Sequence, residues 1–159
     1  MLRNYHLKYI LLLSLFSILS ATLGCPSPQT RTEGGFRLVE AKACKDIKDI
    51  SPGTSVPIEE TDTFLTTDDQ VIMWLKFENI DKPHILRWKW YAPDDILYYD
   101  TGDFTINPEG RYAKAGYADH RILIAGDKAS SLPGEWKVLV FLDGNLKVTK
   151  TFKIVENET

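Results

Sequence analysis

The sequence predicts an all-β fold, a two-layer β-sandwich of about eight strands, for the part of the chain that follows residue 35. After Phe36 almost every apolar run is short and rich in Val, Ile, Phe, Tyr and Trp. Gly, Pro, Asp or Asn separate these runs at intervals that suit turns, and no run shows a convincing helical period. Because each sheet then has one apolar face to cover, two packed sheets are expected, with an open barrel as the alternative.

The N-terminal segment Met1–Gly24 has the layout of a secretory signal peptide. A short basic start with Arg3 and Lys8 precedes the apolar stretch Tyr9–Leu19 and an end made of small residues. That stretch is about half the roughly 20 apolar residues that a spanning helix needs, so a permanent transmembrane anchor is disfavoured. The chain therefore divides into a signal peptide (1–24), a flexible tether (25–35) and a β-sandwich domain (36–159).

Residues Ala21–Cys25 resemble a bacterial lipobox, although Thr22 and Leu23 stand in swapped order relative to common examples. The resemblance implies that Cys25 is the site of lipid attachment, becomes the mature N-terminus and carries fatty acids such as palmitate. Because Pro26 is not acidic, it also implies sorting to the outer membrane if the organism has two membranes. The alternative is cleavage by an ordinary signal peptidase, which would leave a secreted protein without a lipid.

The charge of the mature chain excludes some classes of partner. The first 24 residues hold two of the 19 basic residues and none of the 22 acidic ones, so their removal leaves 135 residues with a net charge of −5. Nucleic acid is not expected as a partner, because proteins that bind nucleic acid usually present a basic surface to it. The sequence also lacks a basic patch for anionic lipid, so membrane association is expected to depend on the attached lipid.

The expected strands follow the short apolar runs. The loop Asp46–Glu60 separates the first two, because Pro52 and Gly53 interrupt it. In the third strand every second residue from Val71 is apolar, with Trp74 on the opposite face, which is typical of a half-buried strand. In chain order the strands are Phe36–Cys44, Thr61–Thr66, Gln70–Glu78, His84–Tyr91, Ile96–Ile106, Arg111–Ala125, Glu135–Leu142 and Leu146–Val155.

The fourth strand has a clear inward face, with Leu86, Trp88 and Trp90 on one side and Arg87 and Lys89 on the other. Turn chemistry closes it at Ala92-Pro93-Asp94-Asp95. The next two strands are each expected to break once, near Gly102 and Gly116, and residues 127–134 form a loop.

The strongest local signal is a C-terminal β-hairpin around Asp143-Gly144-Asn145. In its second arm Lys150 interrupts the apolar row and indicates a bulge or an edge. The apolar faces of the two arms are Trp136, Val138, Val140 and Leu142, and Leu146, Val148, Phe152 and Ile154.

The combination of Trp88-Lys-Trp90, Pro93-Asp94, Gly134-Glu-Trp136-Lys-Val138 and Thr151-Phe152-Lys-Ile154 resembles a recurring pattern of bacterial envelope proteins. Families with this pattern are similar to immunoglobulin-like sandwiches, and many are lipoproteins or secreted proteins without an assigned activity. The resemblance covers roughly residues 44–155, and this chain has Asp95 where the pattern has a turn glycine. It implies a fold and a compartment, and it brings no catalytic residue.

An enzyme is disfavoured because the mature chain offers only His84 and His120 as histidines, and neither lies in a recognisable motif. Cys44 is expected to be a small buried hydrophobic residue rather than a reactive thiol. The acidic residues Asp94, Asp95, Asp100 and Asp103 could supply calcium ligands, but solvated turn aspartates are favoured. No catalytic residue, metal or cofactor is therefore predicted.

The candidate binding surface consists of aromatic residues. Because adjacent residues of a strand point to opposite faces, two neighbouring aromatic residues are not both expected in the core, and one of them is left for the surface. The favoured function is a noncatalytic binding or assembly module of the cell envelope that presents loops or a sheet edge to a protein or a glycan. The alternatives are a structural accessory subunit of an envelope complex, and a small hydrolase or inhibitor. The residues left for exposure are Trp74, Tyr98, Tyr99, Tyr112 and Tyr117.

Overall fold

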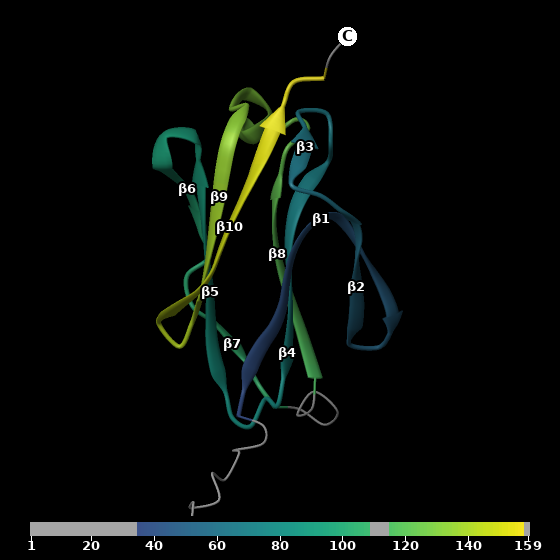
Figure 1. The fold of residues 1–159 in the computed structure, drawn as a ribbon, viewed down its shortest axis with the longest axis vertical. Coiled ribbons are helices and arrows are strands. Elements are labelled where there is room, and N and C mark those ends of the chain that lie inside the picture. The colour runs from purple at the N-terminus through teal and green to yellow at the C-terminus, as the bar shows by residue number, and fades with distance from the viewer. Residues whose placement is uncertain (1–34, 109–114, 158–159) are drawn as a thin grey trace, which may run out of the picture. The chain divides into compact units, whose positions relative to one another are not determined.

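The computed structural model describes residues 35–108 and 115–157, which form ten β-strands and two short 3₁₀ turns. The strands make two sheets that lie face to face, and Figure 1 shows β5, β9 and β10 opposite β4 and β8. The predicted all-β, two-sheet sandwich is confirmed. The signal segment, most of the tether and Cys25 lie outside the described residues.

One sheet has four strands in the order β2-β1-β4-β8, and the other has six. The four-stranded sheet consists of β2 (Thr54–Glu60), β1 (Arg37–Ser51), β4 (Gln70–Glu78) and β8 (Ala115–Leu123). The six-stranded sheet consists, in spatial order, of β3 (Thr63–Leu65), β10 (Asn145–Val155), β9 (Gly134–Leu142), β5 (His84–Ala92) and β6 (Ile96–Asp100), with β7 (Phe104–Ile106) also paired to β5.

The strand order is immunoglobulin-like. In the four-stranded sheet β1, β4 and β8 take the places of strands A, B and E, and in the other sheet β10, β9 and β5 take those of G, F and C. The short strand β3 adds to β10 in parallel, while the other pairings are antiparallel. β6 is a terminal strand of one sheet and β8 is a terminal strand of the other.

The core lies between the sheets and follows the alternation read from the sequence. Trp90 and Trp136 are fully buried, and their rings pack around Phe152. Phe64 packs edge-on against Phe152, with ring centroids 5.6 Å apart. Each of these large side chains contributes about 1.5–3 kcal/mol by leaving water. The inward faces predicted for β4, β5 and β9 are confirmed.

The predicted loop over Asp46–Glu60 is wrong, because β1 continues through Ser51 and forms a hairpin with β2. Pro52 and Gly53 are the turn of this hairpin, and Gly53 has the positive φ of 70° that such a turn requires. Proline is tolerated within β2 because this strand lies at the edge of the sheet.

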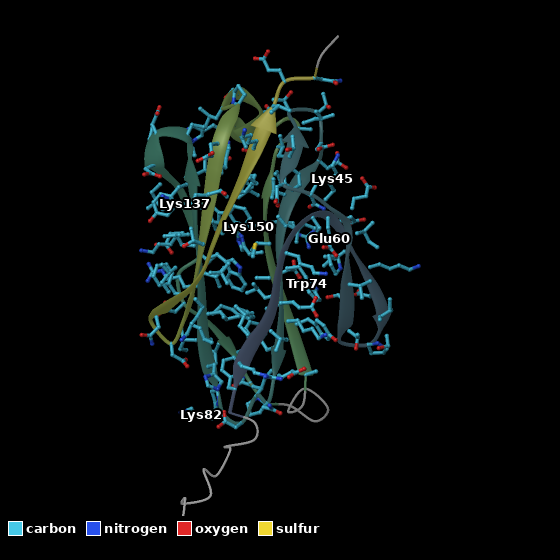
Figure 2. The ribbon with its side chains drawn as sticks, in the orientation of Figure 1. Lys45, Glu60, Trp74, Lys82, Lys137 and Lys150 are labelled. Carbon is cyan, nitrogen blue, oxygen red and sulfur yellow. The ribbon has the colours of Figure 1, made fainter. Side chains whose placement is uncertain are left out.

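The hairpin also covers the outer face of its own sheet and creates a second, small core. Cys44, Ile72 and Trp74 are buried there, with Ile47 and Tyr117 packed against them. Figure 2 shows Trp74 between β4 and β2. Its indole nitrogen donates a 3.0 Å hydrogen bond to the Ser55 hydroxyl. β4 is therefore buried on both faces over Val71–Leu75, whereas the sequence predicted a half-buried strand.

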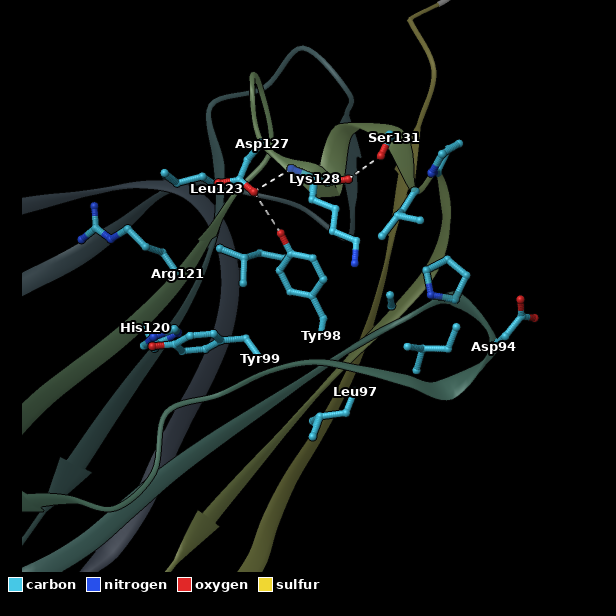
Figure 3. A pocket seen from close by; sticks show the side chains of 16 residues that line it. Asp94, Leu97, Tyr98, Tyr99, His120, Arg121, Leu123, Asp127, Lys128 and Ser131 are labelled. Carbon is cyan, nitrogen blue, oxygen red and sulfur yellow. Dashed lines mark hydrogen bonds between the residues drawn. The ribbon is translucent and has the colours of Figure 1, made fainter.

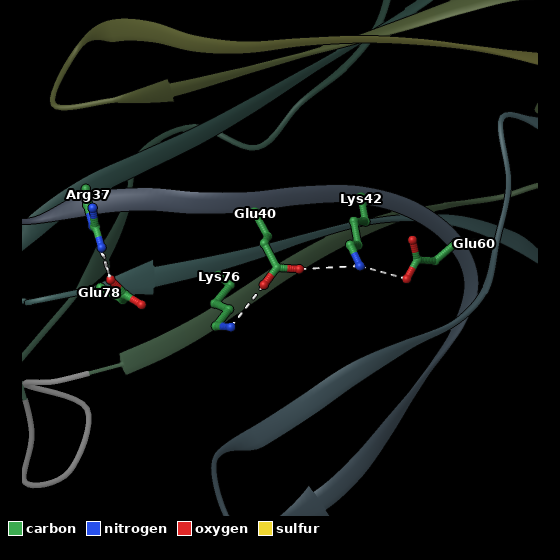
Figure 4. Close-up of polar contacts among 6 residues, drawn as sticks. All are labelled: Arg37, Glu40, Lys42, Glu60, Lys76 and Glu78. Carbon is green, nitrogen blue, oxygen red and sulfur yellow. Dashed lines mark hydrogen bonds and ion pairs between the residues drawn. The ribbon is translucent and has the colours of Figure 1, made fainter.

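Ion pairs keep the rest of this outer face polar. Glu40 accepts from Lys76 at 2.9 Å, Lys42 pairs with Glu60 at 2.9 Å, and Arg37 pairs with Glu78 (Figure 4). The neighbouring lysines lower the pKa of Glu40, mainly through the Lys76 hydrogen bond. Because these groups are solvent-exposed, each pair contributes little stability.

Two strand details differ from the sequence prediction. β8 pairs continuously with β4 from Ala115 to Leu123, so the expected break near Gly116 is wrong. In β10 the bulge lies between Leu146 and Val148 rather than at Lys150, and Leu146 is half exposed. Among the described strands β3 pairs with β10 only from Lys153, so Lys150 lies at an edge, as the alternative predicted. The predicted break near Gly102 and the Asp143-Gly144 turn, with φ of 50° and 75°, are confirmed.

Candidate functional site

The structure separates the predicted aromatic surface into different places. Trp74 is only 3% exposed, so its assignment to the binding surface is wrong. The cause is the β1–β2 hairpin, which covers the face that alternation had left open. Tyr117 packs beside Trp74 on this same outer face, with ring centroids 5.5 Å apart. Tyr112 lies outside the described residues.

Tyr98 and Tyr99 point to the same side of the six-stranded sheet because β6 contains a β-bulge. Trp90 pairs with Tyr99 and Tyr91 pairs with Leu97, which leaves Tyr98 as the extra residue. Tyr98 packs edge-on against Trp136, with centroids 4.9 Å apart. Tyr99 remains 49% exposed. Both tyrosines therefore face the gap between the sheets, an outcome that strict alternation forbids.

His120 of β8 lies opposite this bulge and is held by aromatic neighbours. Its Nδ1 accepts a 3.0 Å hydrogen bond from the indole of Trp90, so the proton of the neutral ring is on Nε2. The Tyr99 ring stacks on it, with centroids 5.3 Å apart and an interplanar angle of 16°. Burial lowers the pKa of His120, which favours the neutral ring. The stack joins the two sheets at their open side.

A cavity of about 760 Å³ opens beside this stack (Figure 3). We call it the β6–β8 groove. It is lined by residues 92–94, by residues 96–99 of β6, by residues 120–123 of β8 and, in the segment after β8, by residues 127, 128 and 131–133. Its volume lies in the range of small-ligand sites. Its border is apolar and open to solvent, with exposures of 62% for Ile96, 52% for Leu97, 49% for Tyr99 and 52% for Leu123.

Polar groups lie at the upper end of the groove. Asp127 accepts hydrogen bonds from the Tyr98 hydroxyl at 3.2 Å and from the backbone nitrogen of Lys128 at 2.6 Å. Burial, followed by the Asp127 charge, raises the pKa of Tyr98, so the phenol stays protonated. Arg121 lies on the opposite border, where it contacts Asp119 at 3.2 Å. The groove thus combines an apolar border with a few fixed polar groups, a composition typical of binding sites.

A second cavity, of about 540 Å³, contains the other histidine. His84 is 4% exposed and stacks on Phe36, with centroids 3.7 Å apart. Its Nδ1 lies 2.7 Å from Asp143 and its Nε2 lies 3.2 Å from Asp81. The pKa of Asp81 is lowered mainly by His84, and that of Asp143 mainly by the Ile85 backbone N–H.

The structure therefore joins His84 to carboxylates, the arrangement that would favour a hydrolase. Both ring nitrogens are engaged by aspartates, so neither is free to take a proton from a substrate. Among the described residues that line this cavity none is a serine, threonine or cysteine. The contacts of His84 with Phe36, Asp81 and Asp143 hold the Phe36 end of the domain in place.

Of the four acidic residues considered as calcium ligands, Asp95, Asp100 and Asp103 contact cationic side chains. Asp100 receives two hydrogen bonds of 2.7 Å from Arg87, which lower its pKa to about 2. Asp95 pairs with Lys137 at 2.6 Å. Within residues 35–108 and 115–157 no three acidic, histidine or cysteine side chains gather as a metal site.

Cys44 lies where the sequence predicted, as a small buried side chain. It is fully buried in the second core, and burial raises its pKa to about 11. The thiol is therefore protonated at neutral pH and a poor nucleophile.

Sequence reasoning found the tyrosines of the groove but missed His120 as their partner. The signal was present, since alternation within Arg111–Ala125 places His120 and Ile122 on one face. What alternation could not show is the bulge in β6, which depends on how that strand pairs with β5.

Comparisons with known proteins add similarity of fold. No protein-family model matches the chain, and no curated protein matches it significantly. A Pseudomonas fluorescens alkylpurine DNA glycosylase bound to DNA is similar over 77% of this chain and 31% of its own, with a TM-score of 0.48 and 9% identity. A β-glucosidase from Erythrobacter marinus is similar over 76% of this chain and 15% of its own, with a TM-score of 0.45 and 12% identity.

An immunoglobulin-like protein from Pseudomonas aeruginosa is similar over 77% of this chain and 98% of its own, with a TM-score of 0.40 and 12% identity. The chain thus spans less than a third of the glycosylase and the glucosidase, but nearly the whole of this protein. At such identities no activity is transferred to this chain. Among the described residues, no helix has the length and apolar character needed to span a membrane.

Proposed function

We propose that this protein is a noncatalytic binding or assembly module of a bacterial cell envelope, attached to the membrane through a lipid on Cys25. The β6–β8 groove is its binding site for a protein or glycan partner of the envelope. The observation that carries this proposal is the apolar, solvent-open border of that groove, formed by Ile96, Leu97, Tyr99 and Leu123.

Three features support binding rather than catalysis. Exposed apolar side chains that gather at one cavity are typical of interaction sites, whereas scattered ones need no explanation. His120 is neutral and stacked, and its Nδ1 is occupied by Trp90. The groove borders two sheet edges, and edges present backbone groups that a partner can pair with.

The lipid attachment rests on the sequence. The lipobox-like residues Ala21–Cys25 follow an apolar segment, and the tether Pro26–Gly35 separates them from the folded domain. A tether of about ten residues spans at most roughly 30 Å when extended. The domain would then stay close to the membrane surface while its groove remained accessible to partners.

A pull-down from envelope extracts tests the binding site. The full chain is used as bait beside two variants, Ile96→Glu in the groove and Ile50→Glu, which changes a similarly exposed residue (58%) outside it. We expect Ile96→Glu to reduce recovery of the partner or glycan at least about tenfold, because a charge would enter an apolar contact. Ile50→Glu should leave recovery unchanged. Equal recovery by both variants, or recovery of nothing by the unchanged chain, would contradict the proposal.

A further inference from the structure

The strand β8 has an open edge along its length. It pairs with β4 over all nine residues from Ala115 to Leu123, and within the described part of the chain no strand pairs with its other side. Its unpaired backbone N–H and C=O groups therefore form a template for another strand. Natural edges of this length are usually protected by charges, bulges or prolines. β8 contains no proline and its pairing shows no bulge, and its charged residues are Asp119 and Arg121.

Exposed apolar side chains gather on the same side of the molecule. Eight large apolar side chains are exposed in the described residues, and five of them border cavities that β8 helps to line. Four belong to the β6–β8 groove at one end of β8. The fifth, Phe104, is 55% exposed and borders a cavity of about 260 Å³ at the other end, next to Gly116 and Tyr117. This distribution marks the β8 side as an interaction surface.

The outward face of β8 carries two opposite charges in positions that complement each other. Asp119 and Arg121 lie two residues apart, so both project from the same face of the strand. Within one chain the two side chains contact each other at 3.2 Å, and they are 27% and 45% exposed, so both remain accessible to a second copy. Because an antiparallel copy of the strand runs in the opposite direction, the order of the two charges is reversed in it.

We propose that β8 pairs antiparallel with β8 of a second copy of this chain, across a two-fold axis at His120. In this register each Asp119 lies opposite Arg121 of the second copy, and each Tyr117 lies opposite Leu123. The half-exposed Leu123 thereby gains an apolar neighbour. Opposite charges and apolar side chains directly across an antiparallel pair both stabilise it. The contact is isologous and closed, so it forms a dimer and not a fibre.

The charges also exclude the neighbouring registers. A shift that moves the axis to residue 119 places Asp119 opposite its own copy, and a shift to residue 121 does the same for Arg121. Like charges directly opposite each other destabilise a strand pair. Axes at 118 or 122 would remove the Asp119–Arg121 pairing altogether. One register is thus selected by two side chains.

This inference deepens the proposed function, because it names a partner for the interaction surface. It rests on the proposed function in one respect, which is that the interaction surface lies on the β8 side of the domain. The partner it names is a second copy, and it uses the backbone edge of β8 and the border residue Leu123 rather than the interior of the groove. The two proposals can therefore fail separately.

Charge reversal tests the register. Sedimentation of the full chain in detergent should show a dimer, and either Asp119→Arg or Arg121→Asp should raise its dissociation constant at least about tenfold, since two pairs change by symmetry. The double variant D119R/R121D restores opposite charges and should bring the constant back to within about threefold of the original. A monomeric unchanged chain, unaffected single variants, or a double variant as weak as the singles would overturn the proposal.

Cysteine cross-linking tests the same register without altering the charges, and it decides the question if a reversal prevents folding. A chain with Tyr117→Cys and a differently tagged chain with Leu123→Cys are produced together. They should form a disulfide-linked heterodimer, because directly opposed residues lie within reach of a disulfide. Each variant alone should form none, since like positions are offset by about 20 Å along the strands. The unchanged chain is the control that shows how much cross-linking arises from Cys25 and Cys44, which both variants also contain. Homodimer bands without the heterodimer band would contradict the register.

These outcomes separate the two proposals. If the disulfide-linked heterodimer forms and Ile96→Glu still recovers the envelope partner, the self-pairing of β8 is supported and the groove is not the binding site. Loss of recovery by Ile96→Glu from a chain that sediments as a monomer would show the reverse.

Discussion

At the residue scale, the histidines of the domain differ in what their neighbours allow. His84 is held between two carboxylates, whereas His120 faces an indole donor and an aromatic ring. Burial lowers the pKa of His120, because the charged ring would lose water without gaining a carboxylate contact. Its protonation is therefore coupled to the stability of the groove.

This coupling predicts a pH dependence. Because the folded-state pKa of His120 lies below the unfolded value of about 6.5, the unfolded chain binds more protons as the pH falls through that value. The free energy of unfolding should therefore decrease as the pH drops from about 7.5 towards 5, above the range in which carboxylates titrate. Denaturant unfolding at a series of pH values measures it.

The control for this prediction is His120→Gln, which keeps a hydrogen-bond acceptor for the Trp90 indole and cannot be protonated. The variant should lose part of the pH dependence in this interval. An identical slope in both chains would show that His120 does not cause it.

The tryptophans illustrate how far residue-level reasoning extends. Trp88, Trp90 and Trp136 were predicted in the core from alternation, and each is at most 2% exposed. Trp74 obeys the same alternation and does lie on the opposite face of β4. It is nevertheless buried, because the β1–β2 hairpin covers that face, and Ser55, 19 residues earlier in the chain, provides the hydroxyl that accepts from the indole.

At the scale of elements, strand existence was easier to predict than strand pairing. The bounds of β4 match the sequence prediction, and the C-terminal hairpin follows from Asp143-Gly144. The bulge in β6, the position of the bulge in β10 and the continuity of β8 were not predicted. Each depends on contacts with a neighbouring strand, and these contacts are not local in sequence.

Gly116 shows why a glycine within a strand does not need to break it. A Cβ atom at this position would lie 2.5 Å from Cδ1 of Ile80, which is itself 3% exposed. The glycine therefore allows the loop before β5 to approach β8 closely. We expect Gly116→Ala to destabilise the fold by about 1–3 kcal/mol, measured by denaturant unfolding, because the core around Ile80 would be overpacked.

A double-mutant cycle with Ile80→Val tests this cause, since that change removes the Cδ1 atom. Alone, Ile80→Val should cost about 0.5–1.5 kcal/mol. In combination the two changes should cost clearly less than their sum, because the clash is absent. Strict additivity would mean that the contact between these two residues does not set the cost of an alanine.

At the scale of the whole molecule, an immunoglobulin-like sandwich leaves one side open. β6 ends one sheet and β8 ends the other, and the space between them becomes the groove. Five of the eight exposed large apolar side chains of the described residues border cavities on this side. Both proposals, partner binding in the groove and self-pairing along β8, depend on this placement.

The proposed attachment of the protein to a membrane through Cys25 gives a separate prediction. Metabolic labelling with a fatty-acid probe should mark the unchanged chain, and Cys25→Ala should abolish the label, because the lipid is carried by that sulfur atom. The matched control is Cys44→Ala, which removes a buried thiol with a raised pKa and should leave labelling intact. Labelling that survives Cys25→Ala would refute the lipid attachment.

The sequence by itself determined the all-β class, most strand positions, the inward faces of β4, β5 and β9, and the C-terminal turn, because alternation and turn chemistry are local properties. It also supplies the whole case for Cys25, which lies outside the described residues. Only the tertiary structure decided that Trp74 is buried, that Tyr98 and Tyr99 share a side with His120, and that no other described strand pairs with the free side of β8. These features arise where strands distant in sequence pair or cover one another, so no local pattern encodes them.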